Sequence, residues 1–286
     1  MPSTLTVAPL VATAAMATAC AVLSVFVVAR RWAFIGEGIS HSGFGGAGLA
    51  WLLMLAFPSL LDSPGVSYAA VILFCLGTAV AIGYLSRGDR VAGDAAIGIF
   101  LVASLAFGFL AQQIFRHVRG TDPADFTAYL FGQRDFSDIS PALAAGVIAV
   151  SVAVLVTVFA LGKEILSYCF DPLMAEASGV RAGFIHYLLM ILIALTIIVG
   201  LPITGSVLVT ALLVLPGVTA TMLTQRLGRV IAIAVAAALV AAVAGVCVNA
   251  TWRFIPIGPA IVLVLFAQFL LAFAAARLGL APVAAR

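Results

Sequence analysis

The sequence predicts an all-α fold, a polytopic transmembrane helical bundle of eight or nine spans, and three observations support this prediction. Hydrophobic residues make up 64% of the 286 residues, charged residues make up 9%, and the mean hydropathy is +1.26. Such a chain has too few polar side chains to cover a water-exposed surface. The apolar residues form runs of about 20, the length of a helix that crosses hydrocarbon, and arginines collect between the runs.

Each predicted span is an apolar window of membrane-crossing length. The windows lie near residues 8–29, 40–60, 66–86, 91–112, 139–161, 184–200, 203–223, 230–250 and 257–276. The first window has no Lys or Arg before Arg30, which indicates a retained membrane helix and not a cleaved signal peptide. The segment Gly200-Leu-Pro-Ile-Thr-Gly205 either turns the chain outside the membrane or kinks one discontinuous helix, which leaves the total at eight or nine. A single membrane domain is expected over residues 1–286.

The basic residues predict the orientation of the spans. They follow every second window, beginning with the first: Arg30, Arg31, Arg87, Arg90, Lys163, Arg181, Arg226, Arg229, Arg277 and Arg286. Because basic loops stay in the cytoplasm, the N-terminus is predicted outside and the C-terminus inside. Four arginines do not fit this rule: Arg116, Arg119, Arg134 and Arg253. The net charge of +3 is therefore attributed to topology, and no nucleic-acid partner is expected.

Glu37 and His41 form the ionisable pair that is costliest at membrane depth. Their spacing of four residues places a carboxylate and an imidazole on one face of a helix. These two groups suit manganese, iron or zinc, and no thiolate that would favour copper(I) lies nearby. Two ligands do not complete a shell, so waters, backbone carbonyls or a second subunit would supply the rest. The structural alternative places Glu37 at the interface near Arg30 and leaves His41 hydrogen-bonded in a helix-packing seam.

Glycines crowd the segment that carries this pair, and two explanations of them stay open. They are Gly36, Gly38, Gly43, Gly45, Gly46 and Gly48. Small residues let helices or a ligand approach the backbone, and they also weaken a helix, as in the broken helices of transporters. The alternative is ordinary close packing between helices, which needs no substrate.

A short capped helix is predicted near residues 171–179, in a loop assigned to the cytoplasm. Asp171 is suited to the N-cap, Pro172 to the first helical position, and Gly179 to the terminator. An independently capped helix of this length suggests a docking element, with Ala175 small enough for close contact and Glu176 charged for a basic partner. A plain interfacial connector is the alternative.

The remaining polar groups are expected to be structural. Asp94 in a first helical turn would complement the helix dipole, and His117 and His186 would lie at the interface. Four cysteines lie far apart without a Cys-x-x-Cys pair and are expected to be small core residues: Cys20, Cys75, Cys169 and Cys247.

No motif for ATP binding or hydrolytic catalysis occurs in the sequence. Lys163 follows Gly162, but Glu164 stands where a phosphate-binding loop would need Ser or Thr. No Ser-His-Asp or His-Glu-x-x-His arrangement supports a membrane protease or esterase. The chain is therefore predicted to be a transport subunit rather than an enzyme, with no permanently bound cofactor.

Four segments in order resemble one family, the membrane-spanning permease subunits of bacterial ATP-binding-cassette (ABC) importers for manganese, zinc or iron. The segments are Arg30-Arg-Trp-Ala-Phe-Ile-Gly-Glu-Gly-Ile-Ser-His41, Tyr129-Leu-Phe-Gly132, Phe170-Asp-Pro172 with Ala175 and Gly179, and Gly205-Ser-Val-Leu-Val-Thr-Ala-Leu-Leu-Val-Leu-Pro216 with Thr219-Ala220. The first is similar to the family's Arg-Arg followed by Gly-Asp-x-x-Ser-His. Glu37 departs from it, because the family usually has Asp at this position, and this bears on metal preference.

The resemblance implies a multi-pass protein of the bacterial inner membrane. Two copies would form the pore, two cytoplasmic ATPase subunits would drive it, and an extracytoplasmic metal-binding protein would deliver the metal. The helix after Asp171 would be the coupling helix that rests on the ATPase, with Asp171, Pro172, Ala175, Glu176 and Gly179 as its characteristic residues.

Three other functions remain open on the sequence. An ABC importer for a metal chelate, such as a siderophore, would not need Glu37 and His41, because a chelate brings its own ligands. A secondary metal transporter driven by protons through this pair would need no ATPase. A membrane scaffold would leave both side chains dispensable.

Overall fold

The computed structural model describes residues 7–57, 64–87, 91–121, 140–252 and 255–278. Its helices are α1 (Val7–Ala29), α2 (Ile35–Ala56), α3 (Pro64–Ser86), α4 (Gly93–Arg119), α6 (Pro141–Ala160), α7 (Gly162–Phe170), α8 (Pro172–Ala177), α9 (Ala182–Leu223), α10 (Leu227–Thr251) and α11 (Ile257–Arg277). Nine stretches within the described residues are long and apolar enough to cross a membrane. The predicted all-α polytopic bundle is confirmed.

Gly205 resolves the ambiguity in the segment that could hold one span or two. Helix α9 runs through this position, but Gly205 has φ 74° and ψ 169°, which is not helical. A positive φ of this kind suits glycine because it has no Cβ. The kink separates two candidate spans, Ala182–Pro202 and Gly205–Leu223. The higher of the two predicted counts, nine, therefore applies.

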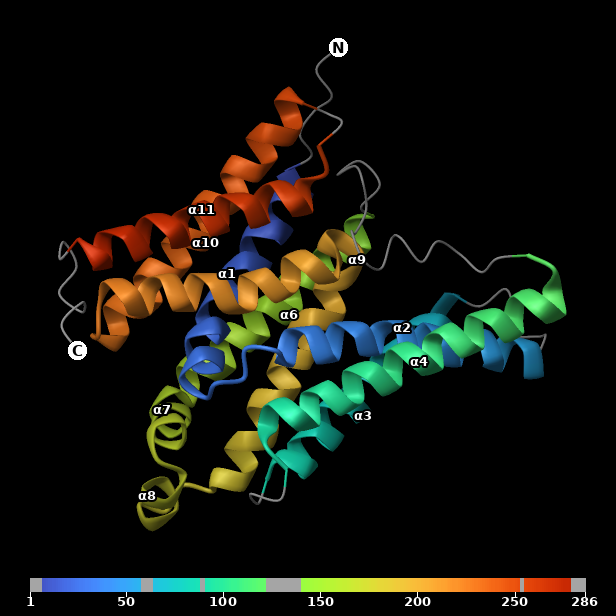
Figure 1. The fold of residues 1–286 in the computed structure, drawn as a ribbon, viewed down its shortest axis with the longest axis horizontal. Coiled ribbons are helices and arrows are strands. Elements are labelled where there is room, and N and C mark those ends of the chain that lie inside the picture. Colours follow the sequence, from blue (N-terminus) through green and yellow to red (C-terminus); the bar gives the residue numbers. More distant parts are fainter. Residues whose placement is uncertain (1–6, 58–63, 88–90, 122–139, 253–254, 279–286) are drawn as a thin grey trace.

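The helices form two groups around a central pair (Figure 1). Helix α2 packs against α3 and α4 in one group, and α10 packs against α11 in the other. Helices α1 and α9 contact each other and lie between the groups, and α1 and the first half of α9 are the most buried of the candidate spans. Helices α7 and α8 project at one edge of the bundle, beside the start of α9 (Figure 1).

One end of the bundle gathers the predicted cytoplasmic arginines. Here α1 and α3 end, and α4 and α9 begin. Arg30 and Arg31 line one cavity at this end, and the Arg87 guanidinium lies against Gly183 in the first turn of α9. We call this the basic end.

The glycines of α2 serve close packing. A Cβ on Gly46 would lie 2.6 Å from the Val71 backbone in α3, and one on Gly48 would lie 3.0 Å from Gly108 in α4. Helix α2 is continuous through these positions, so the broken helix that the glycines could have indicated is absent here. Burial also bears on the cysteines: Cys20, Cys75 and Cys169 are buried as expected, but the prediction for Cys247 is wrong because it is exposed on α10.

Two sequence features lie outside the described residues. They are Tyr129-Leu-Phe-Gly132, one of the four segments of the family resemblance, and the arginines Arg90, Arg134, Arg253 and Arg286.

Candidate metal-binding pair and coupling helix

Glu37 and His41 lie on one face of α2, as their spacing predicts. The distance from Glu37 Oε1 to His41 Nε2 is 2.8 Å. Helix α2 begins at Ile35, so both residues belong to the candidate span Ile35–Ala56. The sequence window that starts near residue 40 placed Glu37 before the span, and this boundary is wrong. Both residues occupy the first turns of the span near the basic end, where a charged pair is costly unless it has a function or a partner.

The pair remains accessible. The Glu37 side chain is 41% exposed and the His41 side chain is 16% exposed. Among the described residues, no group of three or more His, Cys, Asp or Glu side chains is arranged to hold a metal ion. The pair supplies one carboxylate and one imidazole, and a complete shell needs donors of another kind or from another chain.

Thr210 is a neighbour of the pair that sequence reasoning missed. It lies in the second half of α9, where a Cβ on Gly36 would come within 3.2 Å of its Cγ2. Its hydroxyl donates to the carbonyl oxygen of Val207 at 3.0 Å and lies beside the Glu37 carboxyl. Thr210 therefore brings a hydroxyl from a different helix next to the pair.

The short helix predicted near residues 171–179 is present as α8. The Asp171 carboxylate accepts hydrogen bonds from the backbone N–H groups of Leu173 (2.9 Å) and Met174 (3.1 Å), and Pro172 occupies the first helical position. Gly179, with φ 86°, follows the helix in the left-handed region. The predicted cap, first turn and terminator are therefore all observed.

The accessible face of α8 differs from the predicted one. Ala175 is 0% exposed, so the expectation that it offers a docking surface is wrong, because its side chain faces the protein. Large apolar side chains are exposed instead: Leu173 is 78% exposed and Met174 is 64% exposed. Glu176 is exposed, as predicted. Leu173 and Met174 therefore form the candidate contact surface of α8.

His186 lies in the first turns of α9, at the helix entrance where the sequence placed it, and it is buried in a polar cluster. Its side chain is 4% exposed. Its Nδ1 lies 2.7 Å from the hydroxyl oxygen of Tyr168 in α7, and its Nε2 lies 2.9 Å from the carbonyl oxygen of Gly83 in α3. One side chain of α9 is thereby hydrogen-bonded to two other helices.

The hydrogen bonds assign the proton positions in this cluster. A carbonyl oxygen only accepts, so Nε2 of His186 carries the proton and donates to Gly83. Nδ1 is then the acceptor, and the Tyr168 hydroxyl donates to it. Burial raises the pKa of Tyr168 to about 12, against the opposing effect of the nearby Arg30 charge, so the hydroxyl keeps its proton at neutral pH.

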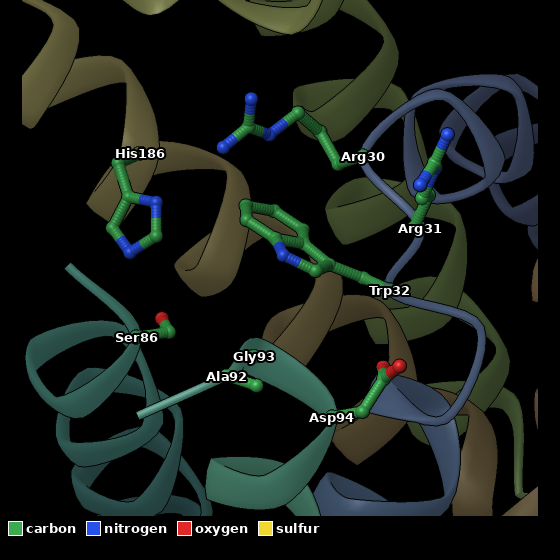
Figure 2. A pocket seen from close by; sticks show the side chains of 8 residues that line it. All are labelled: Arg30, Arg31, Trp32, Ser86, Ala92, Gly93, Asp94 and His186. Carbon is green, nitrogen blue, oxygen red and sulfur yellow. The ribbon is translucent and has the colours of Figure 1, made fainter. Parts of the chain in front are cut away.

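Arg30 and Trp32 complete the cluster from the connection between α1 and α2. The Arg30 guanidinium lies 4.5 Å from the ring centroid of Tyr168 and 5.4 Å from that of Trp32. The Trp32 ring meets the His186 ring edge to face at 5.4 Å. Figure 2 shows the three side chains of Arg30, Trp32 and His186 gathered around one space. We call Arg30, Trp32, Tyr168 and His186 the hub.

A cavity of about 240 Å³ adjoins the hub at the basic end (Figure 2). Arg30, Trp32 and His186 line one part of it, and Asp94 lines the opposite part from the first turn of α4. Asp94 is exposed and lies where a carboxylate complements the helix dipole, as predicted. The cavity leaves the hub side chains room to change their packing.

The described residues contain nine stretches long and apolar enough to cross a membrane, an ionisable pair inside one of them and a capped helix beyond the bundle. These features define a multi-pass membrane protein. The sequence pattern of the ABC 3 transport family matches residues 3–276. The chain belongs to this family, and it is a transport permease of the cell membrane.

Individual relatives and one solved structure are similar to this chain over most of its length. The manganese transport system membrane protein MntC of Halalkalibacterium halodurans is 33% identical over 254 residues, which cover 89% of this chain and 81% of the relative. The chelated iron transport system membrane protein YfeD of Yersinia pestis is 32% identical over 230 residues, covering 80% and 72%. The solved structure of PsaBC from Streptococcus pneumoniae in complex with Fab matches with a TM-score of 0.74 and 25% identity, covering 93% of this chain and 89% of that one.

Proposed function

We propose that this chain is the membrane-spanning permease subunit of an ATP-driven importer that moves a divalent transition metal, manganese, iron or zinc, into the cytoplasm. The observation that carries the proposal is the pair of Glu37 and His41, a carboxylate and an imidazole that face each other at 2.8 Å within a membrane span. The family and the relatives named for manganese and iron transport support the same cargo.

Two copies of the chain would form the pore. A single copy offers two ligands, whereas these metals bind four to six. If Glu37 and His41 of each copy faced a shared axis, a dimer would supply two carboxylates and two imidazoles without a further ligand from either chain. The partial exposure of both side chains leaves them available to a second copy. The metal is then a transported substrate, and no permanently bound cofactor is needed.

A separate cytoplasmic ATPase would supply the energy, because the sequence contains no phosphate-binding loop. The proposed contact is α8, the coupling helix, whose cap at Asp171 keeps it formed and whose Leu173 and Met174 are exposed. An extracytoplasmic metal-binding protein would deliver the metal to the opposite end. The whole chain would act as one permease domain with α8 as its cytoplasmic coupling element.

A metal chelate is the second candidate cargo, since one relative is named for chelated iron transport. A chelate carries its metal in its own ligands, so a route for chelates has no need of a carboxylate and an imidazole in the path. The Glu37 and His41 pair therefore favours the free ion.

The test is metal uptake measured by elemental analysis in cells that lack the native chain and express a variant. Glu37→Gln and His41→Ala are expected to lower accumulation of the transported metal to the level of cells without the permease, because each removes one ligand while leaving the helix intact. His117→Ala, which changes an exposed histidine at the far end of α4, is the matched control and should transport normally. Full uptake by the double variant Glu37→Gln/His41→Ala would refute the metal-binding assignment.

A further inference from the structure

Helices α7 and α8 move as one element if the ATPase moves α8. Only Asp171 separates the two helices, and its backbone is hydrogen-bonded to both. Its N–H donates to the Ser167 carbonyl in α7, and its carbonyl accepts from the Ala175 N–H in α8. On the α7 side, Tyr168 is buried among the spans three residues before Asp171. Any displacement of α8 therefore acts on Tyr168.

Tyr168 is joined to the spans by directional contacts. Its hydroxyl donates to His186 Nδ1 at 2.7 Å, and its ring lies 4.5 Å from the Arg30 guanidinium. A hydrogen bond between two buried side chains has one favourable geometry, so α7 cannot shift without moving His186 or leaving its acceptor unpaired. An apolar contact in the same place would let the two surfaces slide.

The hub leads directly to the start of α2. The Trp32 ring lies against both Arg30 and His186. The Trp32 carbonyl accepts from the N–H of Ile35 at 2.9 Å, and Ile35 is the first residue of α2, two positions before Glu37. Arg31, between Arg30 and Trp32 in the chain, has φ 57°. This backbone conformation is uncommon for a residue other than glycine, so the surrounding contacts must hold it.

The packing of the hub allows movement. The 240 Å³ cavity borders Arg30, Trp32 and His186, so these side chains can shift without overlapping a dense core. The Nε of Arg30 is buried and has no hydrogen-bond partner among the described residues. The guanidinium lies against the rings of Tyr168 and Trp32.

We propose that Tyr168, His186 and Arg30 are positioning residues that transmit displacement of α7 and α8 through Trp32 to the N-terminal turn of α2, and so reorient Glu37 and His41 during the transport cycle. This inference rests on the proposed function and adds the route by which the ATPase reaches the metal-binding pair. It predicts that the hub sets how much metal moves per ATP hydrolysed, not whether metal binds.

The experiment uses the complete importer, the chain with its ATPase and its extracytoplasmic metal-binding protein, reconstituted in lipid vesicles with Mn²⁺ as the probe. Tyr168→Phe removes the hydroxyl and keeps the ring. Tyr187→Phe is the matched control, because the Tyr187 ring also contacts His186, at 5.4 Å, while its hydroxyl makes no hydrogen bond to His186. For Tyr168→Phe we expect Mn²⁺ uptake per ATP hydrolysed to fall about tenfold, within the usual range of coupling free energies, while ATP hydrolysis stays within about twofold of the unmodified importer.

A second measurement follows the hub itself. In a Trp51→Phe/Trp252→Phe background, Trp32 is the remaining tryptophan, and its emission reports the contacts with Arg30 and His186. The emission should change between the nucleotide-free and the ATP-trapped importer. Tyr168→Phe should abolish this change, and Tyr187→Phe should preserve it.

The Mn²⁺ uptake per ATP of the two tyrosine variants decides whether the hub transmits the movement of α8. Normal Mn²⁺ uptake per ATP in Tyr168→Phe overturns the proposal, as does an equal loss in Tyr187→Phe. If Tyr168→Phe does not assemble, the Trp32 emission of the Trp51→Phe/Trp252→Phe protein provides the test. An emission that is the same with and without trapped ATP means that the hub does not move, and it overturns the proposal. Failure of the proposed function is a separate result, seen as Mn²⁺ uptake that survives Glu37→Gln.

Discussion

At the residue scale, the spacing of Glu37 and His41 was sufficient to predict their contact, because residues four apart on a helix share a face whatever the rest of the fold does. The longer side chain of Glu37, where the resembling family usually has Asp, reaches one full turn to His41 at 2.8 Å. Thr210 and His186 could not be found in the same way. Their partners, Glu37 for one and Tyr168 and Gly83 for the other, are distant in sequence and meet through helix packing.

Thr210→Val tests whether the hydroxyl beside Glu37 orients the carboxylate. Valine keeps the shape and removes the donor, so the apparent affinity for the transported metal should fall about tenfold, the usual size of an effect from a group behind a metal ligand. Concentration-dependent Mn²⁺ uptake by the importer gives this value, and the maximal rate should change little. Thr210→Ser is the matched variant and should restore the affinity, because it keeps the hydroxyl. Equal weakening by both substitutions would assign Thr210 to packing alone.

At the element scale, the spans were predictable because each is an apolar run long enough to cross the hydrocarbon core of a lipid bilayer. The start of α2 was placed too late, near residue 40 instead of Ile35. Its first turns hold Gly, Ser, Glu and His, which lower the hydropathy of this stretch, although the glycines and serines there are buried in the bundle. Helix α8 was predictable from its cap and terminator, which are local signals, whereas its exposed face depends on how it sits against α7 and α9.

The double variant Leu173→Ser/Met174→Ser tests the coupling role of α8. Replacing the two exposed apolar side chains should weaken co-purification of the ATPase and lower metal import, because their burial against a partner provides the hydrophobic part of the contact. Ala177→Ser, on the same short helix and also exposed, should leave both measurements unchanged. Normal association and import by the double variant would make α8 a connector.

At the scale of the whole molecule, burial separates the central spans from the peripheral ones. Of the residues in their apolar windows, 72% are buried in α1 and 67% in the first half of α9, whereas the share is 28% in α4, α6 and α11. The peripheral faces are available to lipid or to a second copy of the chain. Sequence could not separate these groups, because every span is apolar all round and the pattern of lipid-facing residues carries little contrast.

The orientation of the molecule is open to a direct test with cysteines at its two ends. Arg30, Arg31 and Arg87 gather at the basic end, so that end is predicted to be cytoplasmic, with α8 on the same side and the end of α4 outside. In a background without native cysteines, Thr121→Cys follows α4 and Ser178→Cys follows α8, and both positions are exposed. An impermeant maleimide added to intact cells should label Thr121→Cys only.

Permeabilised cells provide the control, because both positions should then be labelled if both are accessible. Arg116 and Arg119 lie in the last turn of α4 and oppose the predicted orientation. They also favour the carbonyl end of that helix through its dipole, which is a local reason for their position that does not depend on the side of the membrane. Labelling of Ser178→Cys in intact cells would place α8 outside. It would then be out of reach of any cytoplasmic ATPase, and the route from α8 through the hub to Glu37 could not operate.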